Sequence, residues 1–133
     1  MRSPRARQGR ARDQRGAVAV EMVVVLPLML TLVLLAVQAS LWFHARSIAL
    51  AAAEVGARTS AGRHSSLPSG LAAAEQFADA AGGSHLTRVS VTGSRSATST
   101  TVSVRGEAVR LLPLIPLNLT VAQSATMPVE RLT

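Results

Sequence analysis

The chain has no cysteine, no tyrosine and no lysine, and its aromatic rings are limited to one tryptophan and two phenylalanines. Without cysteine it cannot form disulfide bonds or a cysteine-based zinc site. Without lysine it cannot carry a phosphate-binding P-loop. So few rings argue against a soluble enzyme with a deep aromatic pocket and leave little surface on which nucleic-acid bases could stack. We therefore expect a protein that is not an enzyme.

The residue types that carry chemistry are present but scattered. His44, His64 and His85 do not fall at the helical spacing of a shared metal site. A Gly-x-Ser-x-Gly nucleophile motif is absent, and Glu75 and Asp79 are expected to share one exposed helix face rather than to act as an acid/base pair. We predict no catalytic residue, no cofactor, no metal and no small-molecule substrate.

Positive charge is concentrated at the start of the chain. All 14 basic residues are arginine, and residues 1–16 contain six of them against one aspartate, a net charge of +5 out of +7 for the whole chain. Such a cluster could bind nucleic-acid phosphates, but it directly precedes an apolar segment. We interpret it as a determinant of membrane topology and expect no nucleic-acid partner.

Residues 17–43 form an apolar segment that is long enough to cross a lipid bilayer. Between Met22 and Val37 only Thr31 is polar, and Pro27 should kink or locally open the helix. From Met22 to Phe43 the segment has 22 residues, and a helix of that length spans about 33 Å, close to the ~30 Å hydrocarbon core. The sequence therefore predicts a single transmembrane helix.

The arginines set the expected orientation of this helix. Six precede it and only Arg46 and Arg58 follow within residues 44–62, so the positive-inside rule keeps the N-terminus in the cytoplasm and residues 44–133 outside it. Trp42 and Phe43 stand at the outer end, where aromatic anchors lie at the membrane interface. We predict a single-pass protein of the cell membrane.

The junction between the leader and the apolar segment carries a motif. Residues 15–21 read RGAVAVE, which resembles the processing site of type IV pilin-like proteins, where a prepilin peptidase cuts after glycine and leaves glutamate as the fifth residue. Counted from Ala17, Glu21 is fifth. With Leu26-Pro27 and the ending Glu54–Arg58 (EVGAR), residues 15–58 resemble the TadE family, pseudopilins of the tight-adherence (Flp) pilus system.

The resemblance implies a mechanism of assembly. Cleavage between Gly16 and Ala17 would remove the basic leader and leave a new amine on Ala17. In pilins the glutamate is thought to pair with the amine of an adjacent subunit, so the resemblance implies an assembly role for Glu21. The implied partners are the lipid bilayer, a prepilin peptidase and other pilus-assembly or pseudopilin subunits.

Beyond residue 43 the patterns predict a helix followed by strands. Residues 44–61 continue the helix with an alanine-rich face and a Glu54–Arg58 pair, and 62–70 form a loop. A second helix is expected over Leu71–Ala81. Alternating residues then predict three strands: Leu86–Thr92, Ser99–Leu111 with a bulge suggested by Gly106, and Leu117–Thr126.

Together these elements predict an α+β protein. A long transmembrane helix extends outward and is followed by a small extracytoplasmic domain with a short helix and a three-stranded antiparallel meander. The expected organisation is as follows: leader 1–16, transmembrane helix 17–43, helix extension 44–61, loop and short helix 62–83, and β-rich region 84–133.

An alternative interpretation is a secretory signal peptide. Val37-Gln38-Ala39 before Ser40 is a small-residue pattern at which signal peptidase could cut, which would release a small secreted protein. The apolar run is longer than the usual h-region of 7 to 15 residues and continues into a helix. Both interpretations place residues 44–133 outside the cytoplasm.

Overall fold

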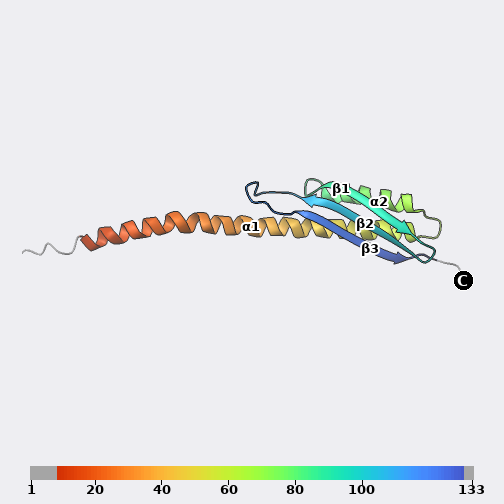
Figure 1. Cartoon of the computed structure of the whole chain (residues 1–133), viewed down its shortest axis with the longest axis horizontal. Coiled ribbons are helices and arrows are strands. Elements are labelled where there is room, and N and C mark those ends of the chain that lie inside the picture. The colour runs from red at the N-terminus through yellow and green to blue at the C-terminus, as the bar shows by residue number, and fades with distance from the viewer. Residues whose placement is uncertain (1–8, 131–133) are drawn as a thin grey trace, which may run out of the picture. The chain divides into compact units, whose positions relative to one another are not determined.

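The computed structural model describes residues 9–130 (Figure 1). The described chain contains two helices and three strands: α1 (Gly9–Ala61), α2 (Leu67–Gly82), β1 (Leu86–Arg95), β2 (Ser99–Ala108) and β3 (Thr120–Pro128). It divides into two compact units, with the boundary between Ala36 and Val37 inside α1. The α+β class, the long N-terminal helix, the short second helix and the three-stranded antiparallel sheet are as predicted.

The described part of the first unit is the N-terminal stretch of α1. The helix begins at Gly9, within the segment predicted as a leader, and residues 1–8 of that leader lie outside the described residues. Pro27 lies inside the helix, and one turn later the Thr31 hydroxyl donates to the Pro27 carbonyl at 2.8 Å. From Gly16 to Ala36 every side chain is exposed except that of Leu34, which is half-buried.

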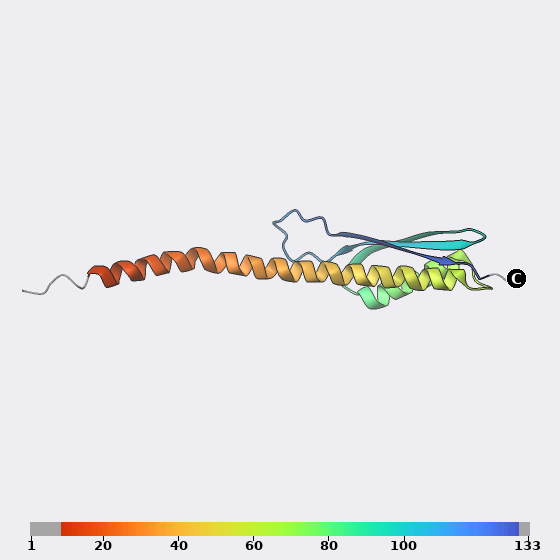
Figure 2. The ribbon, with the colours of Figure 1, turned by 90° about the horizontal axis from the view of Figure 1, so that it is seen from below.

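In the second unit the three strands form an antiparallel meander in the order β1-β2-β3, as predicted. Along the central strand β2, buried and more exposed residues alternate, with Thr100, Val102, Val104 and Ala108 on the buried face. Figure 2 shows the sheet nearly edge-on with both helices on one side of it. The opposite face is open and consists largely of serine and threonine, as expected for an antiparallel sheet with one face in water.

Both helices face the sheet with small side chains. The buried cluster contains five alanines of α1 and two of α2: Ala45, Ala49, Ala52, Ala53, Ala57, Ala74 and Ala78. The two helices approach each other so closely that a Cβ atom added to Gly70 would lie 2.5 Å from the carbonyl oxygen of Gly56. The larger core side chains therefore come chiefly from the strands, with Val102, Val104 and Val121 among the most deeply buried.

A buried hydroxyl pair joins the end of α1 to the sheet. Ser60 Oγ donates to the Gly56 carbonyl at 2.9 Å and lies 2.9 Å from Thr100 Oγ1. Thr100 Oγ1 in turn lies 3.3 Å from the Ser94 carbonyl. Because buried polar groups are costly unless they are hydrogen-bonded, this chain of contacts holds one register of helix against sheet.

The second helix starts earlier than predicted. Leu67–Gly70 was expected to be loop, yet α2 begins at Leu67, and the loop is confined to residues 62–66. Ser66 is the N-cap: its hydroxyl accepts from the Ser69 backbone N–H, and the Ser69 hydroxyl bonds back to the Ser66 N–H. Pro68 is compatible with the first turn because its missing N–H would have no helical partner there. The expected loop signals were therefore helix-start signals.

The bulge predicted at Gly106 lies in the neighbouring strand instead. In β1 the register shifts between Thr87 and Ser90, so that Arg88 and Val89 together oppose Gly106. Arg88, one of the two bulged residues, has a φ of 52°, a left-handed conformation that is uncommon outside glycine. Position 106 requires glycine for a different reason: a Cβ atom added there would lie 2.7 Å from Leu86 Cδ1.

The strand boundaries also differ from the prediction. β1 runs to Arg95 rather than Thr92. The Arg95 guanidinium donates to the carbonyl of Ser65 in the loop between the helices. β2 ends at Ala108 rather than Leu111, and β3 begins at Thr120 rather than Leu117. The residues lost from the two strands, 109–111 and 117–119, join residues 112–116 in the β2–β3 loop, in which Pro113 and Pro116 prevent a regular ladder.

The close contact of the helices gives a first prediction. Gly70→Ala should destabilise the second unit by roughly 1–3 kcal/mol through overpacking, although alanine is the better helix former by about 1 kcal/mol. Gln76→Ala, at an exposed position of α2, is the matched control. Thermal unfolding in detergent, followed by the fluorescence of the single tryptophan Trp42, measures the difference; equal midpoints for the two variants would contradict the packing described here.

Candidate functional site: the apolar helix and the β2–β3 loop

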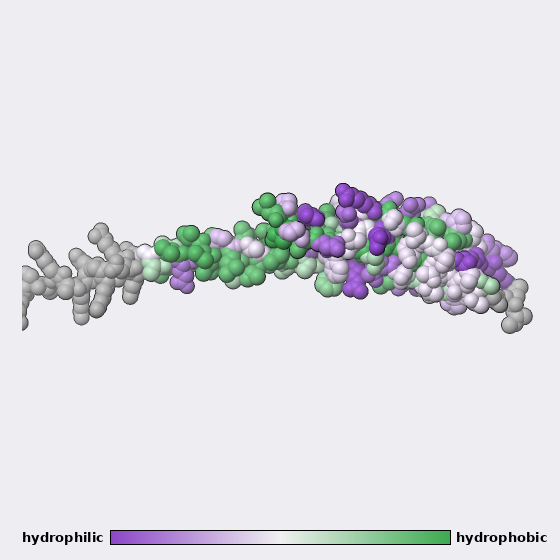
Figure 3. Space-filling view, viewed as in Figure 1, coloured by the Kyte–Doolittle hydropathy of each residue, from purple (hydrophilic) through white to green (hydrophobic). Residues whose placement is uncertain are grey.

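The N-terminal part of α1 is an exposed apolar surface. Among the described residues one helix, Gly16–Ala61 of α1, is long and apolar enough to cross a membrane by length and composition. Between Val18 and Val37 its large apolar side chains are exposed apart from half-buried Leu34, and Figure 3 shows the corresponding hydrophobic surface. A helix that is apolar all round and not covered by protein suits a lipid environment or helix–helix packing.

The predicted processing and assembly residues lie on this helix. Gly16 and Ala17 are exposed, and nothing lies within 4 Å of a Cβ built on Gly16. Glu21 is exposed and borders a shallow, mainly apolar depression with Val18 and Met22. Among the residues whose side chains are described, 16–130, the ion pairs are Glu54–Arg58 and Arg88–Glu107, and Glu21 takes part in neither.

The two predicted interface anchors differ in their surroundings. The Phe43 ring is 59% exposed, whereas Trp42 is half-buried against the core cluster. The two rings meet edge to face with centroids 5.3 Å apart, and the Arg46 guanidinium carbon lies 5.8 Å from the Trp42 centroid. Phe43 therefore offers the freer ring, while Trp42 also belongs to the packing of the second unit.

Gln38 clamps the β2–β3 loop to α1, a contact that sequence reasoning missed. Its side chain is 3% exposed. Nε2 donates to the Val109 carbonyl at 2.8 Å, and Oε1 accepts from the Leu111 N–H at 2.8 Å. The amide thus pairs with the loop backbone as a neighbouring strand would. A lone polar residue directly after a long apolar run was the available signal.

The loop held by Gln38 is apolar and bounded by polar residues. Residues 111–117 read LLPLIPL, preceded by Arg110 and followed by Asn118. A turn at its tip places Pro113 and Leu114 between Leu112 and Ile115, whose N–H bonds back to the Leu112 carbonyl at 3.4 Å. Leu114 at this tip is 96% exposed.

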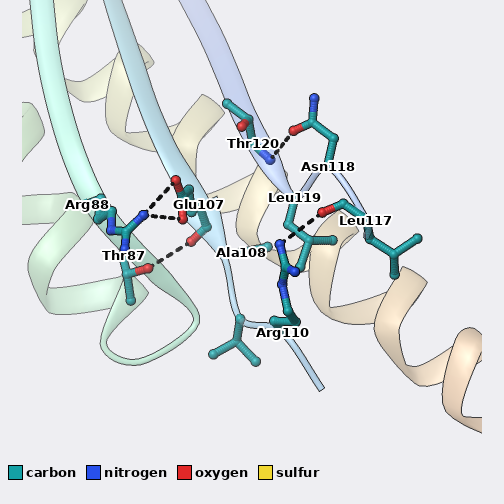
Figure 4. Close-up of a pocket in the computed structure, with 10 residues that line it drawn as sticks. Thr87, Arg88, Glu107, Ala108, Arg110, Leu117, Asn118, Leu119 and Thr120 are labelled. Atoms are coloured by element: carbon teal, nitrogen blue, oxygen red, sulfur yellow. Dashed lines mark hydrogen bonds and ion pairs between the residues drawn. The ribbon is translucent and has the colours of Figure 1, made fainter. Parts of the chain in front are cut away.

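Beside the loop lies an open polar depression of about 390 Å³ at the end of the sheet (Figure 4). Arg88 donates to both oxygens of Glu107 at 3.1 Å, and Arg110 donates to the Leu117 carbonyl at 3.1 Å. The Asn118 Oδ1 atom accepts from the Thr120 N–H at 3.1 Å. These polar groups satisfy one another, so we assign no ligand to the depression.

The structure brings together two of the three histidines that the sequence suggested were scattered. The rings of His44 and His85 meet edge to face with centroids 5.4 Å apart. Across the described residues no group of three or more histidines or carboxylates could hold a metal ion. The pair therefore amounts to a ring contact between α1 and the start of β1.

One comparison with known proteins finds a relationship. Residues 16–58 match the family model described as TadE-like protein, which confirms the resemblance inferred from the RGAVAVE motif, Leu26-Pro27 and the EVGAR ending. The match covers most of α1 and ends before α2. No curated protein and no solved structure matches the chain.

The clamp gives a second prediction. Gln38→Leu should leave the Val109 carbonyl and the Leu111 N–H without partners, a loss of about 1–3 kcal/mol in the stability of the attached loop. In detergent, trypsin should then cut after Arg110 several-fold faster than in the parent protein. Ala39→Leu, at the exposed neighbouring position, is the control and should leave the rate unchanged. Equal cleavage rates for Gln38→Leu and the parent would refute the clamp.

Proposed function

We propose that this chain, whose residues 16–58 match the TadE-like family, is a non-enzymatic pseudopilin in the assembly of a tight-adherence type pilus or related secretion machinery. The observation that carries the proposal is the coincidence of that match with the exposed apolar stretch of α1. A soluble protein would lose about 1.5–3 kcal/mol for each Val, Leu or Met left in water rather than buried. The helix therefore needs lipid or other helices around it.

The same helix supports a single-pass anchor in the cell membrane. Its backbone is α-helical throughout, so apart from the bond that Pro27 cannot donate it satisfies its own polar groups, as the interior of a bilayer requires. The excess of arginine before the span orients the N-terminus toward the cytoplasm and the sheet-containing unit outward. In this arrangement α1 supplies the packing surface for neighbouring subunits, and the exported unit presents its surface to other pilus or secretion components.

Glu21 is the proposed assembly residue. A carboxylate deep in a bilayer costs roughly 2.5–3.5 kcal/mol, less near the interface. Among residues 16–130, whose side chains are described, neither ion pair involves Glu21. Cleavage between Gly16 and Ala17 would create a cationic amine four residues away. Pairing of that amine with Glu21 of an adjacent subunit would offset the cost and set the axial position of the two helices.

The contacts of Gln38 weigh against release by signal peptidase after Ala39. Such a cut would divide the continuous helix α1 and remove Gln38 from the loop whose backbone it binds. The product would keep Leu111 and Val109 with unpaired backbone groups beside an exposed apolar loop. We therefore favour the anchored subunit over the secreted protein.

Processing gives a third prediction. In its native host the mature protein should begin at Ala17, as read by intact mass and N-terminal peptide mapping. Gly16→Leu should abolish this cleavage, because a bulky side chain would occupy the position that the peptidase reads, while Gly9→Leu should leave it intact. A mature chain that begins at Ser40 would instead establish the secreted protein and discard the anchor.

Assembly gives a fourth prediction. Glu21→Leu should leave the protein in the membrane fraction but reduce surface filaments or the recovered assembly complex several-fold, because the charge partner of the neighbouring amine is lost. Glu21→Gln removes the charge but keeps the size and polarity of the side chain, so its assembly compared with that of the parent protein shows the effect of the charge alone. A substitution on the same exposed stretch that keeps it apolar, Leu28→Val, is the control. Normal assembly by Glu21→Leu would remove Glu21 from the mechanism.

A further inference from the structure

Outside α1 the exposed large apolar side chains of the described chain are confined to one place. They are Leu111 and Leu114, both in the β2–β3 loop. The sheet presents its open face with serine and threonine, so this loop is the exception in an otherwise polar surface. Figures 1 and 2 both show the loop extending beyond the end of the strands.

The attachment of the loop fixes its level along α1. Gln38, which binds the backbone at Val109 and Leu111, directly follows the apolar run that ends at Val37. If the bilayer covers residues 17–37, Gln38 lies at its outer boundary; if it covers 22–43, Gln38 lies within it. In either position a span of about twenty residues places the base of the loop at the membrane.

The loop backbone is suited to such a position. Lipid offers no hydrogen bonds, so backbone donors that enter it need partners within the protein. Between residues 111 and 117, Pro113 and Pro116 have no N–H, and those of Leu111, Ile115 and Leu117 are bonded to Gln38, Leu112 and Ile115. In the described structure the N–H groups of Leu112 and Leu114 and the carbonyls of Leu111, Pro113, Leu114 and Pro116 have no protein partner, so the backbone must stay near headgroup level, where water can bond these groups, while the leucine side chains reach deeper. Two prolines and the Gln38 clamp thus reduce the cost of leaving water.

Polar groups border the apolar loop where the lipid headgroups would lie. Arg110 precedes it and Asn118 follows it, and residues 111–117 contain no charge. An arginine at the base of an apolar segment can keep its guanidinium at headgroup level, where anionic phospholipids attract it. This order of residues matches a short segment that enters the membrane from one side and leaves it on the same side.

We propose that the loop Leu111–Leu117 inserts into the outer leaflet of the same bilayer that α1 crosses, as a second membrane contact of the protein. The inference rests on the proposed membrane anchorage of α1. The loop would then hold the sheet-containing unit against the membrane surface until the helix leaves the bilayer for an assembly. The proposed partner is lipid rather than a second copy of the chain. The reason is that the loop is bonded to Gln38, the position at which the apolar run of α1 ends.

Depth-dependent fluorescence quenching tests this proposal, and a chain without cysteine accepts single labels directly. The full chain is reconstituted at high lipid-to-protein ratio in phosphatidylcholine–phosphatidylglycerol vesicles that contain lipids brominated on the acyl chains. A polarity-sensitive dye is attached at Leu114→Cys in the loop, at Leu30→Cys in the exposed apolar stretch of α1, or at His64→Cys in the exposed loop between α1 and α2. Leu30 reports anchorage, Leu114 the proposed insertion, and His64 the aqueous reference.

We expect bromolipid quenching at Leu114 to exceed that at His64 several-fold and to stay below that at Leu30, which lies at the centre of the span. Adding Gln38→Leu should reduce quenching at Leu114 and leave Leu30 unchanged. Quenching at Leu30 but not at Leu114 would overturn the loop insertion while the anchor stands. Absence of quenching at Leu30 would overturn the anchor and with it this proposal. A dye at Leu114 that is shielded from water but not quenched by bromolipid, and that loses this shielding when the protein is diluted in lipid, would show that the loop packs on a second copy of the chain. That result would also overturn the loop insertion.

Discussion

Backbone hydrogen bonding within a single helix is the feature on which the rest of the molecule depends. Helix α1 is continuous from Gly9 to Ala61 and, apart from its ends and the missing N–H of Pro27, satisfies its own backbone polar groups. One element can therefore present large apolar side chains toward an apolar environment and small ones toward a sheet. The change occurs near Gln38. Before it the side chains are exposed and bulky, and after it alanine dominates the buried face.

The small side chains decide how the second unit is held together. Alanine and glycine let α1, α2 and the sheet approach closely, as at Gly56 and Gly70, but they bury little apolar area each. The valines of β2 and β3 and the hydroxyl pair of Ser60 and Thr100 supply much of the rest. A core of this kind is sensitive to added volume, because its elements are already in contact.

The proposed function follows from surfaces rather than from a catalytic constellation. The N-terminal stretch of α1 provides an apolar face with one carboxylate, Glu21, and the sheet-containing unit provides a polar open sheet face with an exposed apolar loop at its end. In the proposed arrangement the neighbours are lipid or other helices for α1, an amine of an adjacent subunit for Glu21, and the outer leaflet for the loop. The hydrogen bonds of Gln38 attach the base of the loop to α1 directly after the apolar run that ends at Val37.

Local patterns in the sequence determined the α+β class, the long apolar helix, the second helix and the three-stranded meander, because period, run length and charge asymmetry are properties of neighbouring residues. The RGAVAVE motif at residues 15–21 and the EVGAR ending also indicated the family whose model residues 16–58 match. The bulge in β1 could have been read from Leu86 and Val89, which both face the core although three positions apart, a spacing that plain alternation forbids.

What only the tertiary structure decided involves residues far apart in the chain. The start of α2 depended on a capping box that the loop composition concealed, and the partner of Gln38 lies 71 residues later, at Val109. Likewise, Gly106 is explained by the side chain of Leu86 across the ladder rather than by its own backbone. Periodicity reports which face of an element is apolar, but which backbone meets a buried polar side chain is decided only when the chain closes on itself.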